Sequence, residues 1–174
     1  MEEIWLPDHL LALPLGSATL WECLAARLPW SQGSEEYTIE FGGNWNEEPP
    51  VPICLRWDSQ TTCPYPWGVP EQTITELAAC GLALILCALF LESDDTRIVT
   101  QGDSFDYWLH DRFGWYGLEV SGTLASEPAR LRSRALEKKR QLLRNTQGLS
   151  GYVVAVGFSI QRILFSAHNF GDDE

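Results

Sequence analysis

Two carboxylates that stand inside short apolar runs are the residues of this chain best suited to chemistry. Asp106 lies in residues 104–110 (SFDYWLH), and Glu119 lies in residues 116–121 (YGLEVS). A carboxylate inside a strand-like run is costly to bury unless a cation or hydrogen-bond donors pair with it. Two such acids on neighbouring strands, followed by a basic helix, indicate a cation that both acids share. The sequence therefore indicates a metal site or an ion cluster, and it names no substrate.

Positive charge is concentrated in one predicted helix, residues 129–145. Residues 130–144 carry seven cations against one acid, a net of +6, although the whole chain carries −12, which leaves −18 on the remainder. A protein that binds nucleic acid by itself usually presents a broad basic face. We expect Arg130, Arg134 and Arg140 to contact phosphates if nucleic acid binds helix 129–145. A basic protein partner that docks on the acidic surface is a second interpretation, and a solvated surface that aids solubility is a third.

The first 70 residues are rich in tryptophan, with six of the eight in the chain. This region precedes the elements that must position the two acids and the basic helix. Residues 17–28 read as a short amphipathic helix that ends before Pro29. Residues 36–41 alternate between apolar and polar side chains, and residues 51–57 form the expected partner strand. The sequence thus predicts an N-terminal helix and a β-hairpin that joins or packs beside the core.

A long apolar helix is predicted over residues 73–92. Thr73 and Glu76 have the spacing of a capping box, in which each side chain bonds the backbone of the other residue. The helix is apolar on nearly every face, so we expect it to be covered by a sheet on one side and by other elements on the opposite side. Its apolar run, Leu77 to Leu91, is shorter than the roughly 20 residues that span a bilayer. We therefore expect a core helix and no membrane segment.

The remaining pattern predicts strands at residues 97–101, 104–110 and 116–122. Helix 129–145 follows, with an apolar stripe formed by Leu131, Ala135, Leu136, Leu142 and Leu143. Two more strands are predicted at residues 152–158 and 162–166. A long helix between the third and fourth strands permits a parallel crossover. The expected fold is α/β: one mixed sheet of about five strands flanked by helices, in a single domain of residues 1–174 that comprises an elaboration (1–70) and a core (71–170).

The sequence also predicts a cellular location and argues against several classes of enzyme and metal site. The first residues are acidic and lack the basic region of a secretory signal, so a cytoplasmic protein is expected. The five cysteines form no CxxC pair and the three histidines are scattered, which argues against zinc and for free thiols in a reducing compartment. The sequence has no Gly-rich phosphate loop, nucleophile elbow or dinucleotide fingerprint, so kinase, hydrolase-fold and dehydrogenase interpretations lack support.

The order of elements from residue 73 to residue 168, together with the two acids, resembles the PD-(D/E)XK nuclease-like superfamily. In that family an aspartate begins the second core strand and an acid-x-lysine motif follows on the third. Asp106 matches the first acid and Glu119 the second, with twelve residues between them. The resemblance implies a restriction-endonuclease-like core that hydrolyses phosphodiesters of nucleic acid. It also implies Mg²⁺ bound by Asp106 and Glu119, with Glu76 as a third carboxylate ligand.

The motif departs from the family at Ser121, which occupies the position of the family lysine. A hydroxyl carries no positive charge and cannot offset the negative charge that develops on the phosphate. Some members of the family recruit this lysine from another element, including the helix that follows. Lys138 and Lys139 are the only lysines in the chain and both lie on that helix. The resemblance therefore implies that one of them is catalytic, whereas the alternative is a solvated helix face that touches phosphates without catalysis.

Three functions follow from these observations. The first is a Mg²⁺-dependent nuclease with a relocated lysine, for which His110, on the same strand face as Asp106, is an additional candidate general base. The second is a nuclease-fold protein without catalysis that serves as a subunit of a larger complex. The third is an acidic adaptor that binds a protein partner through its tryptophan-rich N-terminal region.

Overall fold

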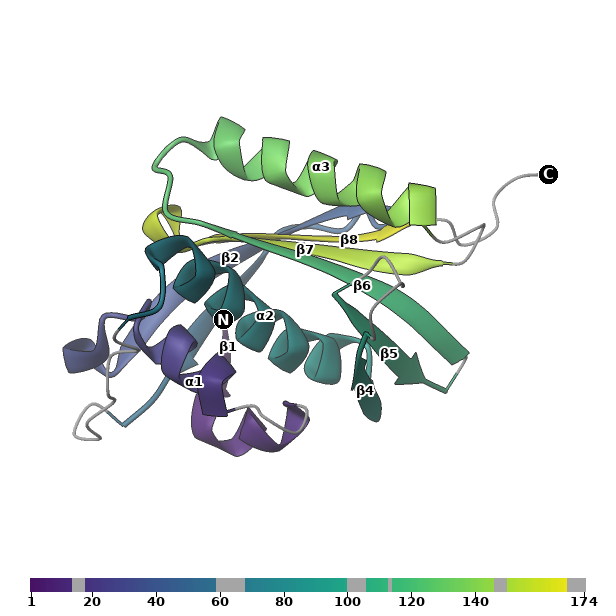
Figure 1. Cartoon of the computed structure of the whole chain (residues 1–174). Coiled ribbons are helices and arrows are strands. Elements are labelled where there is room, and N and C mark those ends of the chain that lie inside the picture. The colour runs from purple at the N-terminus through teal and green to yellow at the C-terminus, as the bar shows by residue number, and fades with distance from the viewer. Residues whose placement is uncertain (14–17, 59–67, 100–105, 113, 146–149, 169–174) are drawn as a thin grey trace.

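An eight-stranded mixed sheet forms the middle layer of the protein, and α-helices cover both of its faces (Figure 1). The computed structural model describes residues 1–174 except 14–17, 59–67, 100–105, 113, 146–149 and 169–174. The strands are β1 (Glu2–Trp5), β2 (Ser34–Gly43), β3 (Val51–Arg56), β4 (Asp95–Ile98), β5 (Tyr107–Asp111), β6 (Gly114–Thr123), β7 (Gly151–Gly157) and β8 (Arg162–His168). The α-helices are α1 (Ala18–Ala25), α2 (Glu71–Phe90) and α3 (Pro128–Asn145), and short 3-10 helices are η1 (Leu6–Ala12), η2 (Trp30–Gln32) and η3 (Phe158–Ile160). The predicted α/β class, a mixed sheet flanked by helices, is confirmed.

The sheet is wider than the five strands expected for the core. Its order is β1-β3-β2-β8-β7-β6-β5-β4, with parallel pairs β1–β3, β2–β8 and β6–β7. Helix α3 makes the crossover between β6 and β7, as predicted for two parallel strands joined through a helix. The three extra strands are the N-terminal hairpin, whose residues 38–43 in β2 pair with residues 162–167 of β8, and β1, which pairs with β3. The hairpin therefore extends the core sheet itself.

Aromatic packing also ties the N-terminal region to the core. Trp45, in the turn after β2, stacks on Tyr152 of β7 with ring centroids 5.6 Å apart. The same indole meets Phe165 of β8 edge-to-face at 5.4 Å. Large aromatic surfaces of this kind contribute strongly to core stability. Elements from both ends of the chain thus share one hydrophobic core.

Helix α2 lies between the sheet and α1, as the burial predicted for helix 73–92 requires (Figure 1). It is apolar around its circumference, and Ile74, Leu82 and Leu86 are fully buried. Among the described helices α2 alone has the length and apolar composition to cross a membrane, and most of it is buried inside the protein. Burial on both sides explains why its sequence lacks a polar face.

The predicted capping box at the start of this helix is wrong. The helix begins at Glu71, directly after Pro70, and the N-cap receives no side-chain hydrogen bond. Pro70 is the N-cap, with a φ of −58° and a ψ of 141°, and its carbonyl accepts the hydrogen bond from the N–H of Ile74 at 3.0 Å, so the helix starts earlier than Thr73. Glu76 is then free to reach the sheet, where it accepts a hydrogen bond from the N–H of Gly122.

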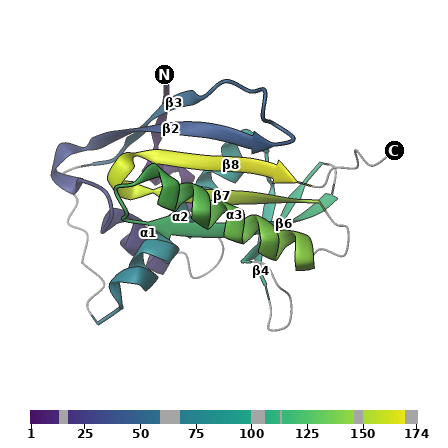
Figure 2. The ribbon, with the colours of Figure 1, turned by 90° about the horizontal axis from the view of Figure 1, so that it is seen from above.

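Helix α3 packs on the opposite face of the sheet, over β6 and β7. Leu131 and Leu142 are buried, but Leu136 and Leu143 are 48% and 46% exposed, so the apolar stripe is only partly covered. The reason is that α3 covers part of one face: Figure 2 shows β8, β2 and β3 beside the helix and not beneath it. A groove lined by residues of α3, β2 and β8 therefore lies on this face of the sheet beside the helix.

Candidate active site

The carboxylates of Asp106 and Glu76 lie beside β6, beyond the point where the pairing of β6 with β5 ends. β5 pairs with β6 only as far as Leu118, so among the described residues no strand meets the next part of β6 on that side. The N–H of Val120 donates to Asp106 Oδ2 at 2.7 Å, and the N–H of Gly122 donates to Glu76 Oε2 at 2.8 Å. Because a buried N–H without a partner is costly, these bonds fix both carboxylates at the edge of β6.

Lys138 joins the two acids that the sequence singled out. Its ammonium lies 3.0 Å from Asp106 Oδ2 and 2.8 Å from Glu119 Oε2. Glu119 points from β6 toward α3, on the sheet face opposite Val120, and α3 brings Lys138 down onto it. The Glu119 side chain is 3% exposed, whereas those of Lys138 and Asp106 are 21% and 34% exposed. We call these three residues the acid–lysine cluster.

Burial and charge act in opposite directions on this cluster. Burial raises the pKa of Glu119 to about 7, assisted by the negative charge of Asp106 and opposed by the hydrogen bond from Lys138. Burial by itself lowers the pKa of Lys138, but the hydrogen bonds and charges of the two carboxylates outweigh it and raise that pKa. Lys138 is therefore charged at neutral pH, while Glu119 can hold or release a proton there.

Ser121, two residues beyond Glu119 on the same face of β6, adds no charge to the cluster. Its side chain is 1% exposed, and its hydroxyl has no hydrogen-bond partner among the residues that the structure describes. The ammonium in the cluster comes from α3 instead. The choice between Lys138 and Lys139, which the sequence left open, falls on Lys138.

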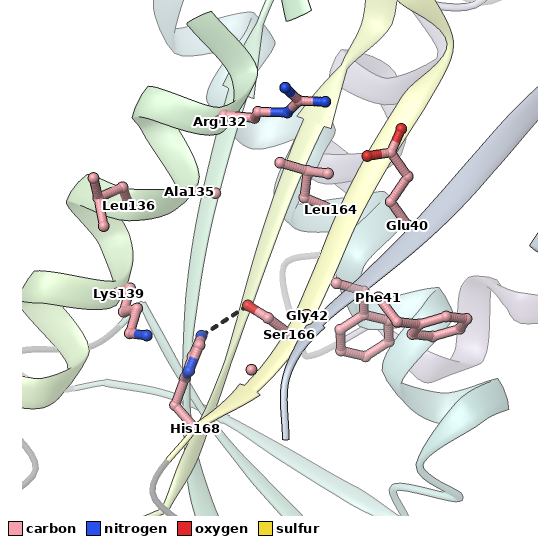
Figure 3. Close-up of a pocket in the computed structure, with 12 residues that line it drawn as sticks. Glu40, Phe41, Gly42, Arg132, Ala135, Leu136, Lys139, Leu164, Ser166 and His168 are labelled. Carbon is pink, nitrogen blue, oxygen red and sulfur yellow. Dashed lines mark hydrogen bonds between the residues drawn. The ribbon is translucent and has the colours of Figure 1, made fainter. Parts of the chain in front are cut away.

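The other predicted site residues are distributed around α3. Arg134 lies 4.0 Å from Glu76 Oε1, so it borders the cluster. Arg130 and Arg140 are exposed on the same helix. Lys139 points in a different direction from Lys138, into a groove next to His168 (Figure 3). Neighbouring helical residues differ by about 100° in direction, which explains why adjacent lysines serve different surfaces.

His110 lies apart from Asp106 and Glu119, although it is on the same strand face as Asp106, the residue before β5. Four residues of strand separate it from Asp106, a distance of about 13 Å. Its Nδ1 lies 2.7 Å from Asp94 Oδ1, and its ring rests against Trp115 at 4.8 Å between centroids. Sequence reasoning missed Asp94, which carries no signal beyond its position in an acidic turn. His110 is therefore not placed to act as a general base for the cluster.

The carboxylates suit a hard cation by their chemistry, since Mg²⁺ prefers oxygen ligands. Asp106 and Glu119 direct one oxygen each to a common point, and Glu76 lies one strand repeat further along β6. That point is held by the ammonium of Lys138. Within the described part of the chain, no group of three or more acidic, histidine or cysteine side chains is arranged to hold a metal. Mg²⁺ would bind Asp106 and Glu119 only if the ammonium moved aside.

Comparison with protein-family models, with curated proteins and with solved structures found no match to this chain. The functional interpretation therefore depends on the geometry and the chemistry of the cluster.

Proposed function

We propose that this protein is a metal-dependent nuclease of the PD-(D/E)XK type that cleaves phosphodiesters of nucleic acid. One observation carries the proposal: Asp106, directly before β5, and Glu119 of β6 meet a lysine that α3 supplies. The order of elements around the cluster, a helix, three strands, a crossover helix and a parallel strand, supports the same interpretation.

Asp106 and Glu119 would hold Mg²⁺, which would polarise the scissile phosphate and acidify a water molecule. With a pKa of about 7, Glu119 can also release or accept a proton at Oε2 near neutral pH. Lys138 carries the positive charge that the family motif places at Ser121, and it would offset negative charge on the phosphate. Arg134, which borders the cluster through Glu76, is placed to attract the nucleic-acid backbone.

A second function is favoured by the same ion pairs. Lys138 already contacts both acids, so the cluster has a cation without any metal. In this alternative the protein is a catalytically inactive nuclease-fold subunit or an acidic adaptor, and the cluster stabilises the fold. Buried ion pairs of this kind are compatible with a purely structural role.

Cleavage and metal binding by purified variants test the proposal. Glu119→Gln and Lys138→Met should each abolish Mg²⁺-dependent cleavage of single-stranded and duplex oligonucleotides. The matched controls are Glu3→Gln and Arg56→Met, which remove the two charges of an exposed ion pair at the far edge of the sheet and should leave cleavage unchanged. Mn²⁺ binding, measured by electron paramagnetic resonance, should be lost in Glu119→Gln but not in Glu3→Gln.

The two functions give different results. A folded wild-type protein that binds no Mn²⁺ and cleaves no oligonucleotide would refute the nuclease and support the structural subunit. Cleavage that survives Lys138→Met would show that the lysine has no catalytic role, because Lys139 points in a different direction from Lys138.

A further inference from the structure

A groove with a volume of about 270 Å³ lies between α3 and the strands β8 and β2 (Figure 3). Its lining comes from α3, β2 and β8, and Figure 2 shows these two strands beside the helix. None of the residues of the acid–lysine cluster lines it. The groove is therefore separate from the candidate active site.

Two cations line the groove from the same side of α3. Arg132 and Lys139 are seven residues apart, or about 10 Å along the helix axis. Neither forms an ion pair with an acid in the described part of the chain. Glu40, across the groove, is already held by Arg162 at 2.9 Å. Within the described residues, the two cations of the groove are thus not paired with a carboxylate, on a chain whose net charge is −12.

The end of the groove near Lys139 offers neutral hydrogen-bonding groups as well. His168 Nε2 and Ser166 Oγ are 2.9 Å apart, and His168 is only 7% exposed. Burial, and then the charge of Lys139, lower the pKa of His168 to about 4, so its imidazole is uncharged at neutral pH. The ammonium of Lys139 attracts an anion such as a phosphate. The imidazole can donate its one N–H to that anion from Nδ1 when the Ser166 hydroxyl donates to Nε2, in place of the 3.5 Å bond from that hydroxyl to the carbonyl of Val153.

Glycine at position 43 keeps this end open. Gly43 has a φ of +66°, and a Cβ there would lie 2.8 Å from the His168 ring and would collide with the carbonyl of Ala167. The imidazole can therefore lie against bare backbone at the end of β2, which sets its position in the groove.

The opposite end of the groove is suited to a flat, partly apolar group. Leu164 on β8 forms an apolar wall beside Arg132, and Ala135 and Leu136 of α3 lie between Arg132 and Lys139 (Figure 3). Arg132, at the same end, has a planar guanidinium that can stack on an aromatic ring. Glu40 supplies carboxylate oxygens nearby, which can accept a hydrogen bond from an amino group.

We propose that this groove binds a nucleotide, with its phosphate at Lys139 and His168 and its base between Leu164 and Arg132. The spacing of the two cations separates the polar end from the stacking end as a phosphate and a base are separated in a nucleotide. The source is either a free nucleotide or one unit of a nucleic-acid strand. The proposal does not depend on the nuclease function, because the groove is separate from the cluster and its test requires no metal and no cleavage.

Histidine ring signals in NMR give a local readout, since the chain has only three histidines. Adding AMP without metal should shift the ring signals of His168 and leave those of His110 in place. Lys139→Gln should weaken the binding of AMP about tenfold, because a hydrogen bond to a charged group is lost. Arg132→Gln should weaken the binding of AMP but not that of inorganic phosphate.

The matched control is Arg144→Gln, which makes the same change of charge at an exposed position of the same helix outside the groove and should alter AMP binding less than twofold. Tighter binding of a short oligoadenylate than of AMP would identify a nucleic-acid strand as the source, and equal binding would identify the free nucleotide. No shift of His168 with either ligand at millimolar concentrations would overturn the proposal. So would equal affinity for inorganic phosphate and AMP, or an Arg144→Gln effect as large as that of Lys139→Gln.

Discussion

Glu119 has the least exposed carboxylate among the described residues, and its environment sets how the acid–lysine cluster responds to pH. Burial favours the protonated form, whereas Lys138 favours the ionised form, and the resulting pKa is about 7. An acid with this pKa changes its charge in the range where most enzymes work. The cluster can therefore exist with one excess negative charge or with none, depending on a single proton.

The raised pKa of Glu119 predicts a stability difference that depends on pH. Between about pH 4.5 and pH 7 the folded protein holds a proton on Glu119 that the unfolded chain releases, so this residue's contribution falls as pH rises. Lys138 stays charged throughout this range and adds no slope. The free energy of unfolding of wild type relative to Glu119→Gln should thus decrease by on the order of 2 kcal/mol between pH 5 and pH 7.5.

Urea unfolding at several pH values measures this difference. The comparison with Glu119→Gln is needed because His168, whose pKa is lowered to about 4, produces a slope of the opposite sign as pH rises through the same range. Both proteins contain His168, so its effect cancels. A difference that does not change with pH would mean that Glu119 is ionised throughout and that the ammonium outweighs its burial.

At the scale of elements, the two long helices illustrate opposite relations between sequence and packing. Helix α2 is buried on both sides, whereas α3 is amphipathic and leaves two leucines in solvent. The apolar pattern of residues 73–92 was sufficient to predict the first arrangement. The apolar stripe of α3 did not predict which of its leucines are buried. Their burial depends on how the helix lies on the sheet and on how many strands the sheet has.

Substitutions of leucine by aspartate test these two environments. Leu84→Asp on α2 should unfold the protein, because it places an unpaired charge in the core, where Leu84 is 2% exposed. Leu143→Asp on α3, where the leucine is 46% exposed, should change the free energy of unfolding by only about 0.5 kcal/mol. Thermal unfolding followed by circular dichroism compares the two variants. Equal stability of both would contradict the burial of α2.

The candidate site could be predicted from the sequence only in part. Asp106 and Glu119 were recognisable because an acid is unusual in an apolar strand, and the lack of other lysines restricted the cation to two neighbours. The choice of Lys138 over Lys139 depends on the rotation of α3 against the sheet, which a short repeat of leucines does not fix. The role of Glu76 was obscured by a local pattern, since a capping box and a contact to a distant strand use the same glutamate.

At the scale of the whole molecule, the N-terminal region completes the sheet. Six residues of β2 pair with β8, and Tyr37 and Ile39 of the same strand are buried in the core. The hairpin and the later core therefore depend on each other for burial of apolar surface.

Removal of residues 1–70 should leave a remainder that does not fold cooperatively. The deletion exposes the edge of β8 and the apolar face of β8 and α2 to water, and exposed edges of this kind promote aggregation. Size-exclusion chromatography and thermal unfolding of the fragment measure the effect. As a control, residues 1–58 and 68–174 expressed together should copurify as a folded pair. A soluble 71–174 fragment with a cooperative transition would instead show that the core is an independent domain.

The hydrogen bonds from Val120 and Gly122 also determine which substitutions can be interpreted at this site. In the described part of the chain, no strand pairs with β6 at Val120 and Gly122 on the β5 side. The carboxylates of Asp106 and Glu76 accept hydrogen bonds from these two N–H groups, which could otherwise pair with another extended chain. Alanine in place of either acid would remove the charge and the hydrogen-bond acceptor together, so a loss of function could reflect self-association. Asparagine at 106 and glutamine at 76 keep an oxygen acceptor in place. They therefore separate the effect of the negative charge from the effect of the hydrogen bonds that these side chains accept from β6.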